Sequence, residues 1–333
     1  MAAARPADVR VYLFTYRRNH LLPRALKSLL AQTHTNWVCE LHNDDPSDPF
    51  PARLMAEVND PRISYVGHER NLGPTATFNH LFQPVAEPFV SLLEDDNWWE
   101  PELLARLLSA IEGFPGVNLA WANCHRWRET DAGEWERAGT IWPLDPQAPF
   151  TVFATPDPRQ VCGALHSNGA MILRVTAETM VPCPGEMPVF AIEPIRERVY
   201  PGALLLIREP LANFALTRET WRTETADENL QVLVLLAETF LARSRFSNAF
   251  YRQMWTACRG SRGHQHRALV VGAFLAGRLT HVLRNARLAD LPVIAGWALR
   301  HPIRFARLFR ARRRFPEVAA FLQTAALRAA SHG

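Results

Sequence analysis

Lysine is almost absent from this chain of 333 residues: Lys27 is the one lysine, and the other residues counted as Lys+Arg are arginines. Lysine and arginine together number 37 against 33 acidic residues, which leaves a net charge of only +4. A charge this small does not favour nucleic-acid binding, and no nucleic-acid-binding motif occurs in the sequence. We therefore expect no nucleic-acid partner, although arginine binds the phosphate groups of smaller molecules well.

Cysteine and long apolar runs are scarce as well. The five cysteines are scattered, and none belongs to a CxxC pair or to a Cys/His cluster with the spacing of a zinc site. No apolar run approaches the roughly eighteen residues of a transmembrane helix. The first residues also lack the apolar core of a signal peptide. These absences predict a reducing compartment and a cytoplasmic protein.

No glycine follows the first predicted strand. Residues 9–15 are rich in β-branched and aromatic side chains, which favour a strand, and they run directly into the polar residues Tyr16, Arg17 and Arg18. A nucleotidyltransferase on a similar sheet usually carries a glycine-rich phosphate-binding loop at this place. The absence of glycine argues against that activity.

The most informative stretch that is present is an apolar run, residues 89–93, ending in Glu94, Asp95 and Asp96. The run predicts a buried strand, and Pro101 suits the first turn of a following helix. Open α/β sheets bind ligands at the carboxyl ends of their strands. Adjacent carboxylates repel one another, and Mg²⁺ or Mn²⁺ would relieve that repulsion. These three acids alone also fit a solvated turn that caps the helix.

Strands and helices alternate through the first part of the chain. Further strands are predicted at residues 37–42, 63–66 and 117–121, with one helix after Pro23 and another over residues 75–82. This alternation predicts the α/β class, with a doubly wound, mostly parallel sheet flanked by helices. The polar segments that follow the strands then face one crevice.

Six segments of the chain, in this order and spacing, resemble the family 2 glycosyltransferases, which have the GT-A fold. They are residues 14–18, 25–33, 43–47, 60–63, 69–73 and 92–101. The resemblance is firm over about residues 8–112 and looser to about residue 225. It implies an inverting transfer of a sugar from a nucleotide-diphosphate donor, expected to be a UDP-sugar, to a hydroxyl acceptor. The acceptor is a sugar, a glycan or a lipid-linked sugar.

The resemblance also implies roles for individual residues. The donor-binding residues are Thr15, Tyr16, Arg17, Asp44, Arg70 and Asp95, and the ligands of Mn²⁺ or Mg²⁺ are Asp96 and Glu94. The family often has aspartate where Glu94 stands. Asp44 by itself would also fit a turn residue, because Asn43-Asp44-Asp45-Pro46 is a composition typical of turns.

An inverting transfer needs a base that accepts the proton of the acceptor hydroxyl. In the family this base is an acid that begins a helix in the second half of the domain, and Glu193 stands at that place with Glu197 as the second choice. Pro194 interrupts the usual acidic pair. Glu193 also fits a first-turn residue that balances the helix dipole.

The expected domain division places a glycosyltransferase domain at residues 1–225, with a nucleotide-binding half at about 8–112 and an acceptor half at about 113–225. A helical extension covers residues 226–333. Its residues 301–316 predict an arginine-rich helix bracketed by prolines. Such a helix packs on the domain with a solvated basic face, or makes peripheral contact with the inner face of a membrane.

The functional hypothesis is therefore a metal-dependent glycosyltransferase of glycan or polysaccharide biosynthesis. The altered region around Glu193 leaves one alternative of a different class: a catalytically inactive relative that serves as a binding or membrane-associated scaffold.

Overall fold

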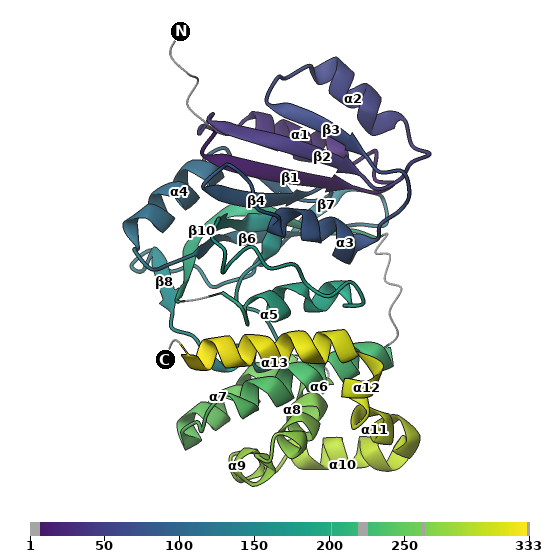
Figure 1. The fold of residues 1–333 in the computed structure, drawn as a ribbon, viewed down its shortest axis with the longest axis vertical. Coiled ribbons are helices and arrows are strands. Elements are labelled where there is room, and N and C mark those ends of the chain that lie inside the picture. Colours follow the sequence, from purple (N-terminus) through teal and green to yellow (C-terminus); the bar gives the residue numbers. More distant parts are fainter. Residues whose placement is uncertain (1–6, 201, 219–225, 261–263, 332–333) are drawn as a thin grey trace. The chain divides into compact units, whose positions relative to one another are not determined.

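The computed structural model describes residues 7–200, 202–218, 226–260 and 264–331. The chain divides into two compact units, whose elements are labelled in Figure 1. Unit 1 comprises residues 1–155, 166–182 and 200–221, and unit 2 comprises residues 156–165, 183–199 and 222–333. Two short segments, 156–165 and 183–199, thus belong to the helical unit. The expected division instead assigned both segments to a first domain that ends at residue 225.

Unit 1 is built around one sheet, whose strands run in the order β3-β2-β1-β4-β9-β6-β10-β5. In addition, β7 pairs with β6 and β8 pairs with β10. The strands are β1 (Val9–Thr15), β2 (Trp37–Asn43), β3 (Ile63–Gly67), β4 (Phe89–Glu94), β5 (Trp98–Trp99), β6 (Leu119–Glu129), β7 (Trp135–Thr140), β8 (Phe150–Phe153), β9 (Met171–Arg174) and β10 (Leu204–Leu216). The helices are α1 (Leu22–Leu30), α2 (Phe50–Val58), α3 (Pro74–Phe78) and α4 (Leu103–Gly113), with 3₁₀ helices η1 (Asn79–Phe82) and η3 (Asn168–Ala170).

The first four strands in space, β3, β2, β1 and β4, are parallel. Beyond them β9 runs antiparallel to both β4 and β6, and β10 runs parallel to β6. The α/β fold class is confirmed. The parallel, doubly wound arrangement belongs to the N-terminal half, and the second half of the sheet is mixed.

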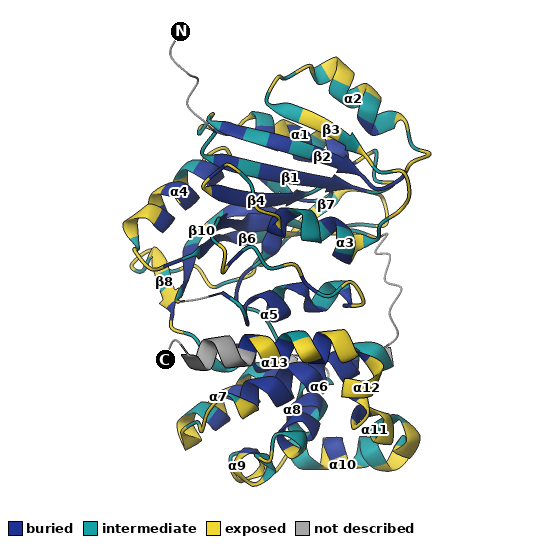
Figure 2. Cartoon of the chain, viewed as in Figure 1, coloured by how far each residue is buried: buried dark blue, intermediate teal, exposed yellow. Residues whose placement is uncertain are grey.

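The core of unit 1 lies between the sheet and the helices that cover it. Figure 2 shows the central strands in dark blue along most of their length. Strands buried on both faces carry nearly continuous apolar runs, which is why β1 and β4 could be predicted from local sequence. Helix α1 contributes Leu22, Leu26 and Leu29 to this core, and α4 contributes Leu103, Leu104 and Leu107.

Several elements differ from expectation. The longest strand, β10, was not predicted, because Arg208, Glu209 and Pro210 interrupt its apolar pattern. The pairing with β6 shifts register at Pro210, and such an irregularity accommodates a residue without an N–H group. Helix α2 was not predicted either. The stretch from 143 to 159, expected to be irregular, contains β8. Residues 126–140, expected to be a hairpin or loop, form the β6–β7 hairpin.

Unit 2 is helical. Its elements are η2 (Pro158–Val161), η4 (Val189–Ala191), α5 (Ile192–Arg196), α6 (Ala226–Ala242), α7 (Asn248–Ala257), η5 (Cys258–Gly260), α8 (His264–Leu275), α9 (Leu279–Arg284), α10 (Asp290–Arg300), α11 (Pro302–Leu308), α12 (Ala311–Arg314) and α13 (Pro316–Ser331). Helix α8 packs closely on α6: a Cβ atom at Gly272 would lie 2.7 Å from Ala237 Cβ. Among the described residues, no helix combines the length and apolarity needed to cross a bilayer.

The expectation of one continuous basic helix over residues 301–316 is wrong. The segment breaks into α11 and α12, and α13 begins at Pro316. Three of its arginines pair with acids of α6: Arg304 with Asp227, Arg312 with Glu238, and Arg314 with Glu228. These ion pairs hold the segment against α6 and neutralise part of the segment's positive charge.

Candidate active site

Polar residues that follow β1, β2 and β4 meet at one edge of the sheet. The parallel register places Thr15 opposite Asn43 and Phe14 opposite Glu94. The ladder continues one step beyond the strands, because Asp44 N donates to Thr15 O at 3.0 Å and Asp95 N donates to Phe14 O at 3.1 Å. The three strands therefore end at one edge of the sheet, and the expectation that their loops face one crevice stays a prediction.

Asp95 is the most enclosed carboxylate at this edge, with only 3% of the residue exposed. Its Oδ2 accepts a hydrogen bond from Tyr16 N at 3.2 Å, and its Oδ1 lies 3.2 Å from Arg18 Nη1. Burial raises the pKa of Asp95 to about 6; repulsion from Asp96 adds to the effect and Arg18 opposes it. A nearby positive charge stabilises the ionised form of a carboxylate in these surroundings.

Asp96 shares Arg18 with Asp95. Its Oδ2 lies 2.6 Å from Arg18 Nη1, and its main-chain carbonyl accepts from Arg24 Nη2 at 2.9 Å. Burial raises the pKa of Asp96 as well, while Arg18 acts in the opposite direction. Arg18 therefore faces two adjacent acids, and a second guanidinium, that of Arg24, reaches the main-chain carbonyl of Asp96.

Glu94 does not join the two aspartates. Its Oε2 accepts from Asn97 Nδ2 at 2.8 Å, and Gly169 of η3 lies so close that a Cβ atom there would be 3.2 Å from the same oxygen. Within the described part of the chain, the acidic residues do not form a group of three converging ligand atoms. The structure therefore brings together Asp95 and Asp96, and directs Glu94 towards Asn97.

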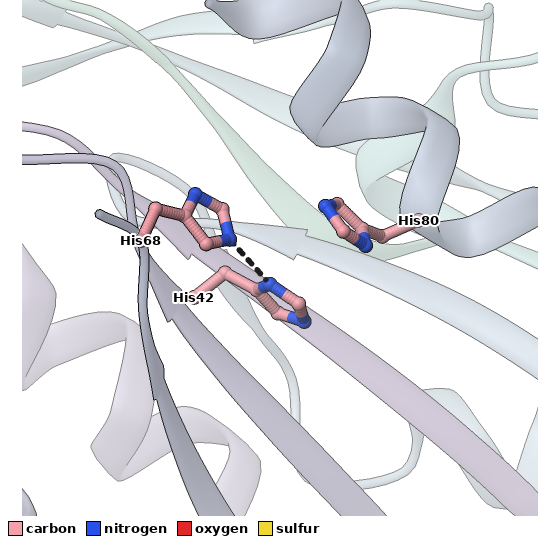
Figure 3. A group of neighbouring side chains, drawn as sticks. All are labelled: His42, His68 and His80. Carbon is pink, nitrogen blue, oxygen red and sulfur yellow. Dashed lines mark hydrogen bonds between the residues drawn. The ribbon is translucent and has the colours of Figure 1, made fainter. Parts of the chain in front are cut away.

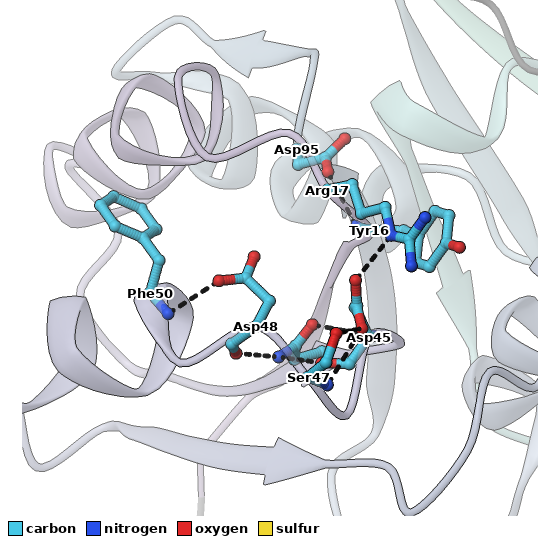
Figure 4. Close-up of polar contacts among 8 residues, drawn as sticks. Tyr16, Arg17, Asp45, Ser47, Asp48, Phe50 and Asp95 are labelled. Carbon is cyan, nitrogen blue, oxygen red and sulfur yellow. Dashed lines mark hydrogen bonds and ion pairs between the residues drawn. The ribbon is translucent and has the colours of Figure 1, made fainter.

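Tyr16 and Arg17 are in the loop that follows β1, next to the loop that follows β2 (Figure 4). Arg17 Nε donates to Asp45 Oδ2 at 2.6 Å, and its guanidinium carbon lies 5.0 Å from the centre of the Tyr16 ring. Hydrogen bonds from the Ser47 hydroxyl and from Arg17 lower the pKa of Asp45 to about 2. Arg17 has a φ of 56°, in the left-handed region, which is uncommon for a residue other than glycine.

Asp44 holds the loop that follows β3. Its Oδ1 accepts from Leu72 N at 2.7 Å, and its Oδ2 accepts from Gly73 N at 3.1 Å. His68 Nδ1 lies 3.0 Å from the same Oδ1. Arg70, in the middle of this loop, is exposed. Asp44 therefore positions the backbone around Arg70, a role that turn composition alone would not have indicated.

Arg18, which contacts both aspartates, also lines a cavity of about 440 Å³. The other residues that line this cavity are His20, Leu21, Glu129, Thr217 and Arg218. A volume of this size is typical of pockets for small ligands. In the sequence Arg18 stands out only as part of the loop after β1, and no motif marks Glu129, which is at the end of β6.

Arg24, which binds the Asp96 carbonyl, packs on Trp98. The Arg24 guanidinium lies 3.7 Å from the centre of the Trp98 ring and 4.5 Å from that of Trp135. Burial lowers the pKa of Arg24 to about 10. Trp99 is buried and its Nε1 donates to Gly169 O at 2.8 Å, so it is a core residue.

The two acids expected to supply the base belong to unit 2 and differ from each other in their surroundings. Glu197 is buried, and its carboxylate accepts from Gln160 Nε2 and from Leu165 N, both at 2.6 Å. Glu193 is in the first turn of α5 and is partly exposed. Because Glu197 already receives two hydrogen bonds inside unit 2, its environment is that of a structural residue.

Comparison with known proteins points in one direction. Residues 11–150 match the model described as glycosyl transferase family 2. The succinoglycan biosynthesis protein ExoU of Rhizobium meliloti is 28% identical over 109 residues, covering 33% of this chain and 32% of that protein. The Escherichia coli glucosyltransferase WfgD, which acts on GlcNAc-diphosphoundecaprenol with UDP-Glc, is 26% identical over 103 residues, covering 31% of this chain and 40% of that protein. The matches thus span about a third to two fifths of these relatives.

Solved structures share the fold. TarS of S. aureus, residues 1–349 in complex with UDP-GlcNAc, superposes with a TM-score of 0.55 at 12% identity, covering 96% of this chain and 92% of that one. The complex of the same protein with UDP gives a TM-score of 0.52 at 13% identity, covering 98% and 92%. At this identity the likeness concerns the fold alone.

Proposed function

We propose that this chain, which residues 11–150 identify as a member of glycosyl transferase family 2, transfers a sugar from a nucleotide-diphosphate donor to a hydroxyl acceptor with inversion. The process would be the synthesis of a glycan or polysaccharide. One observation carries the proposal: Asp95 and Asp96 share Arg18 at the carboxyl end of β4, and Arg18 also lines a cavity of about 440 Å³. Ligands bind at this end of the strands in open α/β sheets.

The donor set at this corner fits Mn²⁺ or Mg²⁺. Asp96, assisted by Asp95, offers hard oxygen ligands, and burial, which raises the pKa of both acids, makes a cation beside them favourable. Bound there, the cation would neutralise the departing nucleoside diphosphate. Glu94 would contribute only after leaving Asn97.

Residues of the first three loops would hold the donor, for which a UDP-sugar is the proposed choice. Tyr16 and Arg17 present a ring and a guanidinium at the mouth of the site, with Thr15 beneath them at the end of β1. Asp44 would act on the nucleoside side, both directly and by holding the loop that carries Arg70. Arg70 is exposed and would be available to the diphosphate.

Glu193 is the proposed base, on the strength of its place in the sequence and its partial exposure in α5. Its carboxylate would accept the proton of the acceptor hydroxyl as the new glycosidic bond forms. Glu129 is a second carboxylate to test, because it lines the cavity next to Arg18.

The acceptor would be a sugar, a glycan or a lipid-linked sugar, and the chain would work in the cytoplasm. We also propose peripheral membrane contact through the C-terminal segment, which is divided into short helices and is not one continuous basic helix. Leu299 and Ile303 are 82% and 69% exposed, and Arg300, which follows Leu299, is exposed as well. Exposed apolar residues beside arginines are typical of surfaces that contact anionic lipid.

A screen of nucleotide sugars with Mn²⁺ or Mg²⁺ tests the function, with release of nucleoside diphosphate as the measured quantity. We expect release from one donor to require the metal and to increase when the correct acceptor is added. If no donor is cleaved but nucleotides still raise the thermal midpoint, the alternative of a catalytically inactive binding module is favoured instead.

A further inference from the structure

Three histidines converge in unit 1 at a place that the proposed reaction does not use. His42 is on β2, His68 directly follows β3, and His80 is on η1 (Figure 3). One ring nitrogen from each lies within 4.8 Å of the others. The parallel pairing of β2 with β3 continues to His68, whose N–H donates to Asn43 O at 3.1 Å. The sheet itself therefore brings His68 to His42.

Carboxylates determine which nitrogens of two of these rings carry a proton. His42 Nε2 lies 3.1 Å from Glu40 Oε2, and His68 Nδ1 lies 3.0 Å from Asp44 Oδ1. An ionised carboxylate only accepts hydrogen bonds, so each of these nitrogens is the N–H of its ring. In neutral rings the opposite nitrogens, His42 Nδ1 and His68 Nε2, are then unprotonated.

These two unprotonated nitrogens face each other at 3.0 Å. Two lone pairs at this distance repel unless an electropositive atom lies between them. A shared proton would make one ring an imidazolium, and would place that charge in a ring pair of which His42 is buried. The other possibility is a metal ion, whose tetrahedral coordination by imidazole places ligand nitrogens about 3.3 Å apart.

We propose that His42, His68 and His80 bind a zinc-like divalent cation, with Asp44 and Glu40 as the carboxylates that orient two of the ligands. Neutral imidazoles suit Zn²⁺ and its neighbours, whereas Mg²⁺ and Mn²⁺ prefer oxygen. A carboxylate behind a ligating histidine is the usual partner in such sites. The ring centres lie 4.7 to 5.4 Å apart, and one nitrogen of each ring lies within 4.8 Å of the others.

The bound cation would stabilise the part of the sheet whose loops are proposed to hold the donor. The cation would join β2, the loop after β3 and η1. It would also hold His68, whose partner Asp44 positions Leu72 and Gly73. The site is chemically distinct from the Asp95–Asp96 pair, because its ligands are nitrogens and not oxygens. Either site can therefore fail experimentally without the other.

The test measures zinc bound to the full-length chain, prepared without a polyhistidine tag and stripped of metal. Elemental analysis and competition with a chromogenic zinc chelator report stoichiometry and affinity. Co²⁺ can replace Zn²⁺ as a spectroscopic probe, because tetrahedral Co²⁺ absorbs visible light. We expect one Zn²⁺ per chain, a raised thermal midpoint with Zn²⁺, and no such rise with Mg²⁺.

The diagnostic variants are His80→Ala and His68→Gln. His80 is partly exposed on a short 3₁₀ helix, so its loss is compatible with folding, which circular dichroism checks. Each variant should weaken zinc binding by at least about tenfold. The matched control is His281→Ala, an exposed histidine of α9, which should bind zinc as the wild type does. Zinc binding that survives in both diagnostic variants would overturn the proposal, as would a wild-type chain that binds no zinc and instead shares a proton between His42 and His68.

Discussion

Arg18 Nη1 lies 2.6 Å from Asp96 Oδ2, and the same nitrogen reaches Asp95 Oδ1 at 3.2 Å. The guanidinium thus occupies the position of a counter-ion to both acids. Its side chain is 23% exposed and also lines the neighbouring cavity. A metal at this corner and Arg18 act on the same two negative charges, which makes the arginine a direct probe of the metal proposal.

Arg18→Met should affect stability and metal affinity in opposite directions. Without metal the two acids lose their counter-charge, and the free energy of unfolding should fall by about 2 kcal/mol, less than for a fully buried pair. Affinity for Mn²⁺ should rise, because the cation no longer competes with the guanidinium. Thermal unfolding with and without Mn²⁺ measures both effects. Unchanged Mn²⁺ affinity in a folded variant would place the cation elsewhere.

Asp96→Asn tests the proposed ligand with little change of shape. Turnover of the nucleotide sugar should fall by about 10²-fold or more, since an amide neither carries the negative charge nor binds Mn²⁺ comparably. Glu112→Gln, at an exposed carboxylate of α4, is the control and should retain wild-type turnover. Metal-dependent turnover that persists in Asp96→Asn means that this carboxylate is not the ligand.

The raised pKa of Asp95 predicts a pH dependence of stability. Its ordinary pKa of 3.8 applies to the unfolded chain and a pKa of about 6 to the folded one, so between pH 4 and 6 the folded state binds more protons. Stability should therefore fall as pH rises through this window and stay lower above it. Asp95→Asn should remove that fall and raise the stability at pH 7.5 by at most about 3 kcal/mol.

Thermal unfolding of the wild type and of Asp95→Asn from pH 3.5 to 8 measures this effect in the absence of metal. Below pH 4 the two curves should approach each other, because Asp95 is then protonated in both folded and unfolded wild type. Parallel curves across the whole range would show that Asp95 titrates normally.

The two candidate bases in α5 and just after it should respond differently to amide substitution. Glu193→Gln should lower kcat by about 10²- to 10⁴-fold with donor affinity unchanged, because only proton acceptance is lost. Glu197→Gln should mainly reduce stability, since Gln160 Nε2 and Leu165 N then lose their carboxylate acceptor. Rate measurements at saturating donor, paired with thermal unfolding, separate the outcomes. Full activity in Glu193→Gln with a loss in Glu129→Gln would assign the base to Glu129.

Much of the N-terminal half could be predicted because its signals are local. The apolar runs of β1, β2 and β4 are continuous, and α1 shows helical spacing of leucines. Once those strands are parallel, their following residues must meet at one edge, so the neighbourhood of Tyr16, Asp44 and Asp95 follows. The strand β10 escaped prediction because its pairing with β6, not its own pattern, holds it in place across the irregularity at Pro210.

The sequence by itself determined the fold class, the strand that ends in Glu94, Asp95 and Asp96, and the family resemblance of its first half. Only the tertiary structure decided which partners these acids have: Arg18, nearly eighty residues earlier, joins Asp95 and Asp96, while Asn97 takes Glu94. It alone revealed the histidine cluster as well, which has no motif spacing because it depends on strand register and on the placement of η1. Local patterns record which residues are buried, whereas the direction and partner of a polar side chain are set by contacts between distant segments.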